Sequence, residues 1–262
     1  MIAGIDFGST LTKIVLMDGD NVLRRDRISR GESVEAVLNG PEYKGLDRIM
    51  ITGTGSVGHE GNIAGIPTYV VDEFKATAKG AAFISGKAEC VVVSVGTGTL
   101  FLYVNGDKIE HIGGAAIGGA TLVTLGNLLC GVDSAPKLYE LALKGDVSRT
   151  DIRIADVAKQ EFEDLMNHVT VANMGKLTVD SKAEDKALGI CNLIFQNIGV
   201  MTVFGDRKYG TGCAVMIGTT SQNELAKRFF KEVGDLFGLE FIVPDDASYA
   251  MAIGAAIDTE TI

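Results

Sequence analysis

The sequence predicts an α/β protein made of two related lobes with a ligand cleft between them. Its 262 residues are 46% hydrophobic and 22% charged, which provides enough apolar material for a folded core. A strand, a glycine turn, a second strand, an Asx-Gly turn and a third strand occur twice. The two copies keep a nearly constant offset, 96 − 8 = 88 residues from Gly8 to Gly96 and 106 − 19 = 87 from Gly19 to Gly106. Glycine clusters at the ends of apolar runs indicate backbone that approaches a ligand closely.

The strands of the two copies are expected over residues 2–7, 12–17 and 22–28 and over 90–95, 100–104 and 108–112. Runs of β-branched residues joined by Asx-Gly turns are typical of hairpins. The remaining segments alternate between helices and strands, as in layered α/β folds. We expect helices over 34–38, 57–64, 73–85, 118–130, 154–169, 183–203, 224–237 and 248–258, and strands over 48–52, 68–71, 214–217 and 240–243. Because no flexible linker separates the halves, we expect an N-terminal lobe of residues 1–89 and a C-terminal lobe of residues 90–262.

The charge and the chain's apolar runs exclude several classes of partner. Lys and Arg number 24 against 34 Asp and Glu, so the formal net charge is −10 and the sequence pI is about 4.8. We therefore expect no binding to nucleic acid or to an anionic membrane. The first residues lack a signal peptide's basic start and long apolar core, and no uninterrupted apolar run reaches transmembrane length. A cytoplasmic protein is expected.

The four cysteines are widely and irregularly spaced and form no Cys-x-x-Cys pair. A zinc or iron–sulfur cage made by one chain is therefore not expected. Each cysteine has apolar neighbours in the sequence, so we interpret them as buried thiols: Cys90, Cys130, Cys191 and Cys213.

The first motif with residues suited to ligand binding or catalysis joins the first two strands. A carboxylate ends a buried strand, a glycine turn with two hydroxyls follows, and a lysine lies in the next strand. Backbone amides of such turns bind phosphate oxygens, the carboxylate is suited to hold Mg²⁺, and the lysine to neutralise a phosphate. The alternative is a plain hairpin with a solvated Asp and Lys, although a buried Asp needs a partner. The segment is Asp6, Phe7, Gly8, Ser9, Thr10, Leu11, Thr12 and Lys13.

The second motif, residues 95–99 with Thr97 at its centre, repeats this arrangement in the second half. Two such loops at matched positions favour a triphosphate gripped from both sides. The loop is not a Walker motif, because Gly-Lys-Ser/Thr is missing. It is not a Rossmann fingerprint either, because the glycine turn leads into a strand.

Two further segments of small residues are weaker signals. Residues 113–121 precede an apolar helix, whose start can accept an anion or let a nucleotide lie on the backbone; close helix packing is the alternative. Residues 217–223 end a strand in glycine and continue with small polar residues. This pattern is typical of an adenine-binding turn, and equally of an ordinary helix cap.

The fifth candidate is the Asp72-Glu73 pair at an expected helix start. An acidic residue in a first helical turn usually caps the helix or interacts with its dipole. The functional interpretation is a general base for a substrate hydroxyl.

Taken together, these motifs resemble the actin-like ATPase and sugar kinase superfamily, whose lobes are ribonuclease H-like. Within it, the chain resembles the bacterial type II pantothenate kinases nearly from end to end. The resemblance rests on residues 4–13, 73–74, 95–99, the glycine segment after His111, the more specific Ala-Asn-x-Gly run within 170–175, and residues 217–220 and 252–255.

The resemblance implies roles for individual residues. It implies that Glu73 is the catalytic base and that Asp6 holds Mg²⁺. The positions that it implies for ATP binding are the segment Asp6 to Lys13, Thr97, Gly119, Ala120, Thr121, Leu122, Val123 and Thr219. It further implies a homodimer and an ATP-dependent phosphorylation of pantothenate as the first step towards coenzyme A. Acyl-CoA is a candidate partner.

The chain departs from that family at the position implied to contact pantothenate, where the family's arginine is replaced by His111. Histidine is shorter, is only sometimes charged and lacks arginine's fixed fork of donors. Either His111 performs a reduced version of the arginine's task, or the acceptor is a pantothenate analogue.

Two other functions stay open at this point. Relatives with the same lobes are ATPases that activate radical dehydratases through an iron–sulfur cluster between subunits, which needs paired cysteines from each chain. The other alternative is a nucleotide- or acyl-CoA-binding regulator without turnover. Retention of Asp6, Lys13 and Glu73 favours a kinase over such a regulator.

Overall fold

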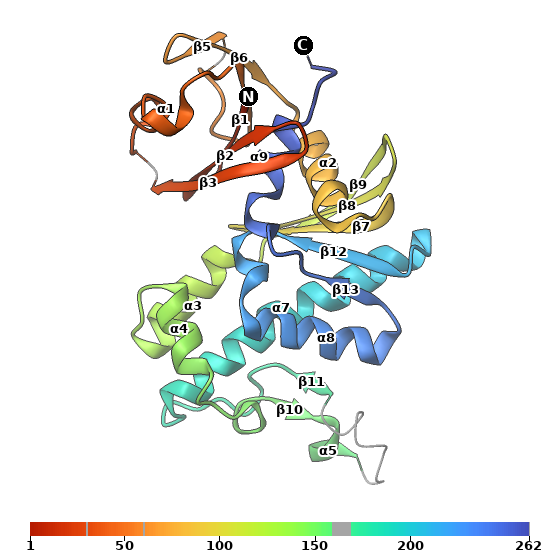
Figure 1. The fold of residues 1–262 in the computed structure, drawn as a ribbon. Helices are drawn as coiled ribbons and strands as arrows, with labels where there is room; N and C mark the ends of the chain where they lie inside the picture. The colour runs from red at the N-terminus through yellow and green to blue at the C-terminus, as the bar shows by residue number, and fades with distance from the viewer. Residues whose placement is uncertain (30, 60, 159–168, 262) are drawn as a thin grey trace.

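The computed structural model describes residues 1–262 except 30, 60, 159–168 and 262 (Figure 1). In these ranges it contains two large β-sheets, with helices between and outside them, and a small two-stranded sheet. In the described ranges the first sheet has six strands in the order β3-β2-β1-β4-β6-β5, and the second has five in the order β13-β12-β7-β8-β9. The strands of the first sheet are β1 (Ile2–Phe7), β2 (Leu11–Asp18), β3 (Asn21–Ser29), β4 (Arg48–Thr52), β5 (Gly61–Ile63) and β6 (Ile66–Val70). Those of the second are β7 (Glu89–Val95), β8 (Thr99–Asn105), β9 (Lys108–Ala115), β12 (Cys213–Ile217) and β13 (Glu240–Ile242).

The two sheets share one topology, which confirms the duplication predicted from the sequence. In the first, β1, β2 and β3 form an antiparallel meander, and β4 and then β6 are added parallel to β1. In the second, β7, β8 and β9 form the same meander, and β12 and then β13 are added parallel to β7. The two glycine turns therefore occupy equivalent places, each between the first two strands of its sheet.

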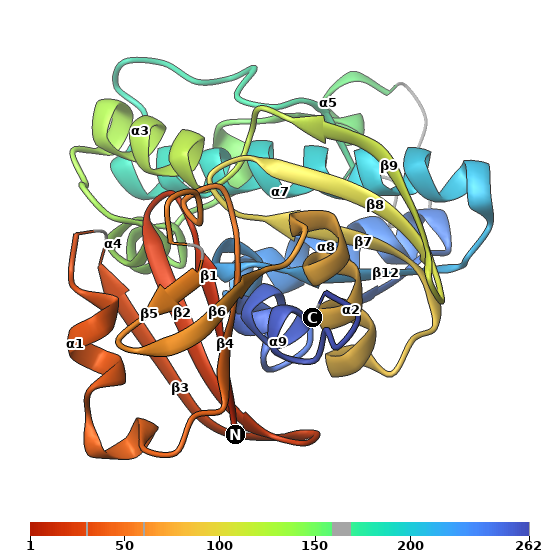
Figure 2. The same cartoon turned by 90° about the horizontal axis from the view of Figure 1, so that it is seen from above.

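Two helices lie between the sheets (Figures 1 and 2). They are α2 (Glu73–Ser85) and α9 (Ala250–Ala256). Ala78 and Ala81 of α2 join the apolar cluster on the second sheet. Ala252 and Ile253 of α9 join a cluster on β2 of the first sheet. Each half of the chain thus supplies one helix to the opposite sheet, and the boundary between residues 89 and 90 stays a prediction.

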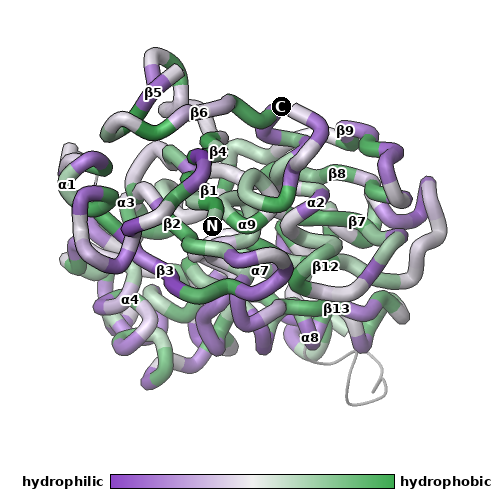
Figure 3. Tube along the Cα trace, turned by 45° about the horizontal axis from the view of Figure 1, so that its top comes forward, coloured by the Kyte–Doolittle hydropathy of each residue, from purple (hydrophilic) through white to green (hydrophobic). Residues whose placement is uncertain are grey.

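The outer face of each sheet is covered by the remaining helices. On the first sheet lies α1 (Val34–Leu38), and on the second lie α3 (Gly119–Cys130), α4 (Ala135–Ala142), α7 (Ala183–Tyr209) and α8 (Glu224–Phe237). A small unit of β10 (Ile152–Arg153), α5 (Ile154–Val157) and β11 (Thr170–Ala172) lies beyond α7. In Figure 3, β7, β12 and α9 run mainly through hydrophobic residues, whereas edge strand β3 is largely hydrophilic.

Helix α7 belongs to the core of the second half. Of the described helices, it alone is long and apolar enough to cross a membrane, and 67% of its most apolar window is buried inside the molecule. Phe195 and Ile198 of this helix are fully buried against the second sheet. The apolar length of α7 is therefore explained by core packing.

Some predicted elements differ from the structure only at their ends, such as α7, which was predicted to end at Val203 and continues to Tyr209. Strands β10 and β11 were not predicted. Three further differences concern helices. The helix expected over 57–64 is a loop followed by β5, because Gly58 and Gly61 have φ of 88° and 94° and Ala64 has 52°, outside the helical region. The helix expected over 154–169 ends at Val157, and its continuation over 159–168 lies outside the described residues. Helix α4 was not predicted, although Ser134 followed by Pro136 is typical of a helix start.

Candidate active site

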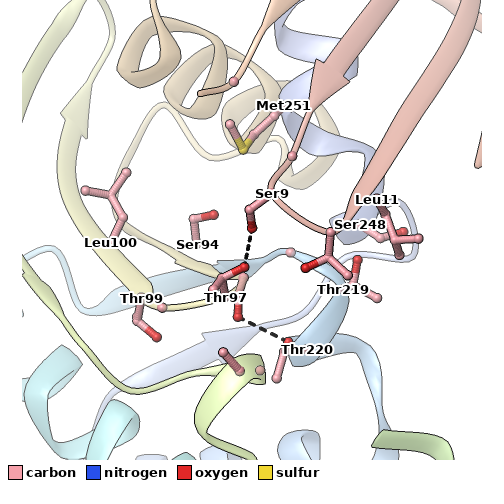
Figure 4. A pocket seen from close by; sticks show the side chains of 18 of the residues that line it. Ser9, Leu11, Ser94, Thr97, Thr99, Leu100, Thr219, Thr220, Ser248 and Met251 are labelled. Atoms are coloured by element: carbon pink, nitrogen blue, oxygen red, sulfur yellow. Dashed lines mark hydrogen bonds between the residues drawn. The ribbon is translucent and has the colours of Figure 1, made fainter. Parts of the chain in front are cut away.

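A cavity of about 890 Å³ lies between the two lobes. Its walls come from both glycine turns, the starts of α2 and α3, the turn after β12 and the segment leading into α9. In Figure 4, the contact between Ser9 and Thr97 lies in the middle of the cavity, with Thr219 and Ser248 on one side and Leu100 on the other. The described residues that line it and were proposed from the sequence are Asp6, Gly8, Ser9, Thr10, Leu11, Lys13, Glu73, Thr97, Gly119, Ala120, Val123 and Thr219.

The first glycine turn is anchored by an ion pair. The antiparallel register of β1 and β2 places Asp6 opposite Lys13, and the Lys13 Nζ lies 2.9 Å from the Asp6 Oδ2. Asp6 is 3% exposed, so the lysine provides the partner that a buried carboxylate needs. A Cβ on Gly8 would lie 2.7 Å from the Leu11 carbonyl oxygen and 3.2 Å from the Lys13 Nζ, so only glycine fits this turn.

The second glycine turn faces the first across the cleft. Its backbone closes on itself through the Gly96 amide, which donates to the Gly98 carbonyl at 2.9 Å. The Ser9 and Thr97 hydroxyl oxygens are 2.5 Å apart, so the tips of the two turns are joined by a hydrogen bond between the lobes. Two turns with backbone and hydroxyl groups therefore converge on one space, as a polyphosphate requires.

The start of α3 packs directly on the second turn. The Gly119 amide donates to the Gly96 carbonyl at 2.7 Å and the Ala120 amide to the Thr97 carbonyl at 3.2 Å. A Cβ on Gly118 would lie 2.8 Å from the Thr97 carbonyl oxygen, so the glycines here permit close packing. The first two amides of this helix are thus occupied by protein, and a ligand would meet the surface of Gly119 and Ala120 rather than an open helix end.

The turn after β12 is separate from the cap of the next helix. Gly218 has φ of 93° and approaches β7 so closely that a Cβ would lie 2.5 Å from the Val95 carbonyl oxygen. Asn223 caps α8 by accepting the Ala226 amide at 2.9 Å. Thr219 is therefore not needed as a helix cap, and it lies in the cavity wall near Ser248.

Asp72 and Glu73 have different roles, since Asp72 caps α2 and Glu73 lines the cavity. Asp72 caps α2 by accepting the Lys75 amide at 2.9 Å. Glu73, the first residue of α2, is half-buried in the cavity wall, and in the described part of the chain its carboxylate has no hydrogen-bond or salt-bridge partner. Burial, followed by the negative charges of Asp6 and Asp72, raises the pKa of Glu73 above its ordinary value. A half-buried, unpaired carboxylate with a raised pKa is suited to accept a proton.

His111 lies outside the cavity lining but next to the start of α2. It is exposed on β9, opposite Leu102 on β8. Its ring stacks on Phe74, with ring centroids 5.1 Å apart and planes 23° from parallel. Because Phe74 follows Glu73, His111 is placed at the same end of the cavity as the candidate base.

Four of the predicted ATP-site residues do not line the cavity. Phe7 and Thr12 are buried in the first sheet, Leu122 is fully buried in the core of the second half, and Thr121 bonds weakly to the Ala116 carbonyl at 3.4 Å. Their side chains support the walls, so any contact with a ligand would come from their backbone.

Several residues of the lining were not predicted from the sequence. Gly53 and Thr54 follow β4, and Gly53 packs on the first turn, where a Cβ would lie 2.7 Å from the Asp6 Oδ1. Their glycine cluster was a usable signal. The others had no distinctive local pattern: Ser94, Leu100, Thr124, Ala135, Ala247, Ser248 and Met251.

Metal-binding chemistry at this site is limited to single carboxylates. Among the described residues no group of three or more His, Cys, Asp or Glu side chains is arranged to hold a metal ion. Asp6 offers one buried carboxylate at the cavity wall. That is the protein share expected for Mg²⁺ that arrives with a nucleotide, since phosphates and water supply its other ligands.

Solved structures with the same two-lobed, actin-like ATPase fold include the activator of 2-hydroxyisocaproyl-CoA dehydratase from Clostridium difficile with bound ADPNP, with a TM-score of 0.68, 19% identity, and coverage of 97% of this chain and 92% of that one. A ROK family glucokinase from Streptomyces griseus in complex with glucose and AMPPNP has a TM-score of 0.62, 13% identity and 97% coverage of both chains.

The chain belongs to the Fumble family, whose sequence model matches residues 87–223, or 137 of 262 residues. It is also 25% identical over 265 aligned residues to the type II pantothenate kinase of Staphylococcus aureus strain USA300, covering 97% of this chain and 98% of that protein. The resemblance drawn from the motifs is thereby confirmed.

Proposed function

We propose that this protein is an ATP-dependent kinase that phosphorylates the primary hydroxyl of pantothenate or of a close analogue. The carrying observation is that Glu73, an unpaired carboxylate with a raised pKa, lines the same cavity as the two glycine turns and Lys13. Similarity to a type II pantothenate kinase over nearly the whole chain supports the acceptor class.

The mechanism follows from this arrangement. Glu73 would accept the proton of the acceptor hydroxyl as its oxygen bonds to the γ-phosphorus, and the bond from that phosphorus to the bridging oxygen would break to release ADP. Lys13 and the amides of both turns would stabilise the charge on the transferred group. Mg²⁺ bound with ATP would neutralise phosphate charge, and Asp6 is the residue that would hold it.

The nucleotide is proposed to lie across the two turns. Its phosphates would meet Ser9, Thr97 and Lys13, and its adenine would lie towards Thr219 and Ser248, on the other side of the Ser9–Thr97 contact from Leu100. The hydrogen bond between Ser9 and Thr97 would open to admit the phosphates. The homodimer and acyl-CoA as a binding partner are part of the same proposal.

The alternatives are less well supported. A dehydratase activator with a cluster between subunits needs two accessible cysteines from each chain, but Cys90, Cys191 and Cys213 are buried, and burial raises the pKa of each thiol. A regulator without turnover gives no reason for an unpaired Glu73 beside the glycine turns.

A substitution that removes only the proton acceptor tests the proposal. Glu73→Gln keeps the size and polarity of the side chain, so we expect kcat to fall by a factor on the order of 10²–10⁴ while ATP binding is nearly unchanged. In the wild type, the acid limb of kcat should have its midpoint above 4.5, the ordinary pKa of glutamate, because the folded pKa is raised. ADP release with pantothenate as acceptor measures both.

Asp72→Asn is the matched control, because it removes the adjacent charge while asparagine still caps the helix. It should retain most of the activity. Comparable turnover by Glu73→Gln and the wild type would contradict the assignment of the base. Absence of ADP release with pantothenate and its analogues would contradict the kinase proposal itself.

A further inference from the structure

We propose that the acceptor of this kinase is uncharged at the end remote from its hydroxyl, an amide rather than a carboxylate. The inference rests on the proposed function and narrows its substrate class. It depends on three features: a neutral cavity floor, an aromatic wall beyond that floor, and the lack of an unpaired cation among the described lining residues.

The floor of the cavity beside α2 is a row of small and apolar side chains. Ser94 on β7 is directly opposite Leu100 on β8, and Leu100 is directly opposite Gly114 on β9. Residues paired in this way point to the same face of a sheet. All three line the cavity, so an acceptor lying across them meets one hydroxyl, one aliphatic side chain and bare backbone.

Beyond the edge of this floor, outside the cavity lining itself, the Phe74–His111 stack forms an aromatic wall. Leu102 lies on the same face of β8 as Leu100. It is directly opposite His111 on β9, so His111 follows Gly114 along the same face of the sheet. Its ring lies against the Phe74 ring at a centroid distance of 5.1 Å. A stacked imidazole offers ring-edge nitrogens but neither a permanent charge nor a guanidinium's pair of parallel donors.

The described cavity lining offers no unpaired cation to an acceptor. The only charged side chains among the described lining residues are Asp6, Lys13 and Glu73. Lys13 is bound to Asp6 at 2.9 Å on the side of the first glycine turn. A carboxylate at the far end of the acceptor would therefore have no cation among the described lining residues to pair with, and an unpaired charge in a partly buried site is unfavourable.

A matched pair of acceptors tests this inference. Pantothenate and its N-alkyl amide share the reacting hydroxyl and differ in whether the far end carries a carboxylate. At about pH 8 we expect kcat/KM for the amide to exceed that for pantothenate by about tenfold or more, with the same KM for ATP. ADP release measures both reactions in the full-length wild-type protein.

A substitution at the wall should reverse the preference. His111→Arg supplies the missing cation, so kcat/KM for pantothenate should rise by about tenfold while that for the amide changes little. Val179→Arg is the charge control, because Val179 is 92% exposed in a loop before α7 and should leave both values unchanged.

The outcomes separate the two proposals. Equal use of both acceptors, or a preference for pantothenate in the wild type, overturns the inference and leaves the kinase proposal standing. A His111→Arg variant with an unchanged preference overturns the role of the Phe74–His111 wall. If the wild type phosphorylates neither compound, the proposed function fails and the inference fails with it.

Discussion

Asp151 is a buried carboxylate outside the cavity that accepts several hydrogen bonds. Its side chain is fully buried and accepts hydrogen bonds from the Asn192 Nδ2 at 2.6 Å and the Met174 amide at 2.8 Å, with a weaker one from Asn173 at 3.3 Å. Met174 has a φ of 59°, a conformation that this hydrogen bond helps to hold. One carboxylate thus fixes the turn after β11 against α7.

Replacing this carboxylate should destabilise the fold measurably. Asp151→Asn keeps the volume of the side chain but replaces its two carboxylate oxygens by one amide oxygen and one amide nitrogen. The new N–H donors would face the Asn192 Nδ2 and the Met174 amide, which are donors themselves. We expect a loss of about 1.5–3 kcal/mol in the free energy of unfolding, the range for hydrogen bonds to charged groups. Urea unfolding measures it, with Asp180→Asn at an exposed position as the control. Equal stability of the two variants would show that the network is not needed.

At the scale of elements, the closest approach is the crossing of α2 and α9. A Cβ on Gly80 would lie 1.8 Å from the Ala250 carbonyl oxygen, and a Cβ on Gly254 would lie 1.8 Å from the Ala76 carbonyl oxygen. Both obstacles are backbone atoms, which cannot rotate away. Because these helices join the two sheets, their spacing also sets the spacing of the lobes.

A methyl group at this crossing should be poorly tolerated. Gly254→Ala should lower the free energy of unfolding by about 3 kcal/mol or more, at the upper end for overpacking. Gly205→Ala in α7 is the matched control, because its Cβ would have an ordinary contact of 3.5 Å with Ile112 and alanine favours helix by about 1 kcal/mol. Urea unfolding of both variants checks the contrast, and a stabilised Gly254→Ala would contradict the crossing.

The C-terminal segment is clamped to α2 by a small ionic network. The buried Asp258 carboxylate lies 2.9 Å from the Lys75 Nζ and 2.7 Å from the Lys79 Nζ, and both lysines also reach Glu260. Burial by itself would raise the pKa of Asp258, but hydrogen bonds from Lys79, Thr261 and Lys75 outweigh it and lower the pKa to about 2.

This lowered pKa predicts a specific pH dependence of stability. A carboxyl group with a depressed folded pKa contributes stability that is fully present above its ordinary value of 3.8 and is lost as the pH falls towards about 2. The difference in unfolding free energy between the wild type and Asp258→Asn should therefore be constant above about pH 5 and shrink below pH 4. Chemical unfolding across that range measures it; a difference independent of pH would contradict the clamp.

Elements with strong local signals were predicted from the sequence, and those fixed by other parts of the chain were not. Residues 73–85 and 224–237 form helices with the predicted bounds. The helix expected over 57–64 does not form, because Gly58 and Gly61 adopt positive φ, which interrupts the apolar periodicity of the segment. Helix α4 is short, and its only strong local signal is Ser134 followed by Pro136 at its start.

For the whole molecule, the duplication was the most informative sequence feature. The offset of 88 residues between Ser9 and Thr97 corresponds to a direct hydrogen bond between the two turns. Residues from the end of the chain, such as Ala247 and Met251, could not be placed from the sequence. They reach the cavity only because α9 returns between the sheets, and that path depends on long-range packing.

Two lobes that close on one ligand should be stabilised by it as a unit. A ligand that binds only the folded state stabilises it by about 2.7 kcal/mol at one hundred times its Kd, which is roughly a 5–10 °C rise in Tm for a domain of this size. We therefore expect Mg-ATP at about that excess to raise the Tm of the wild type by several degrees.

Lys13→Ala should remove most of this shift. Because it also leaves Asp6 buried without its partner, the quantity to compare is the change in Tm on adding Mg-ATP within each variant. Lys144→Ala, at an exposed position after α4, should keep the full shift. A wild type whose Tm does not respond to Mg-ATP would contradict the cleft as a nucleotide site, whatever the acceptor.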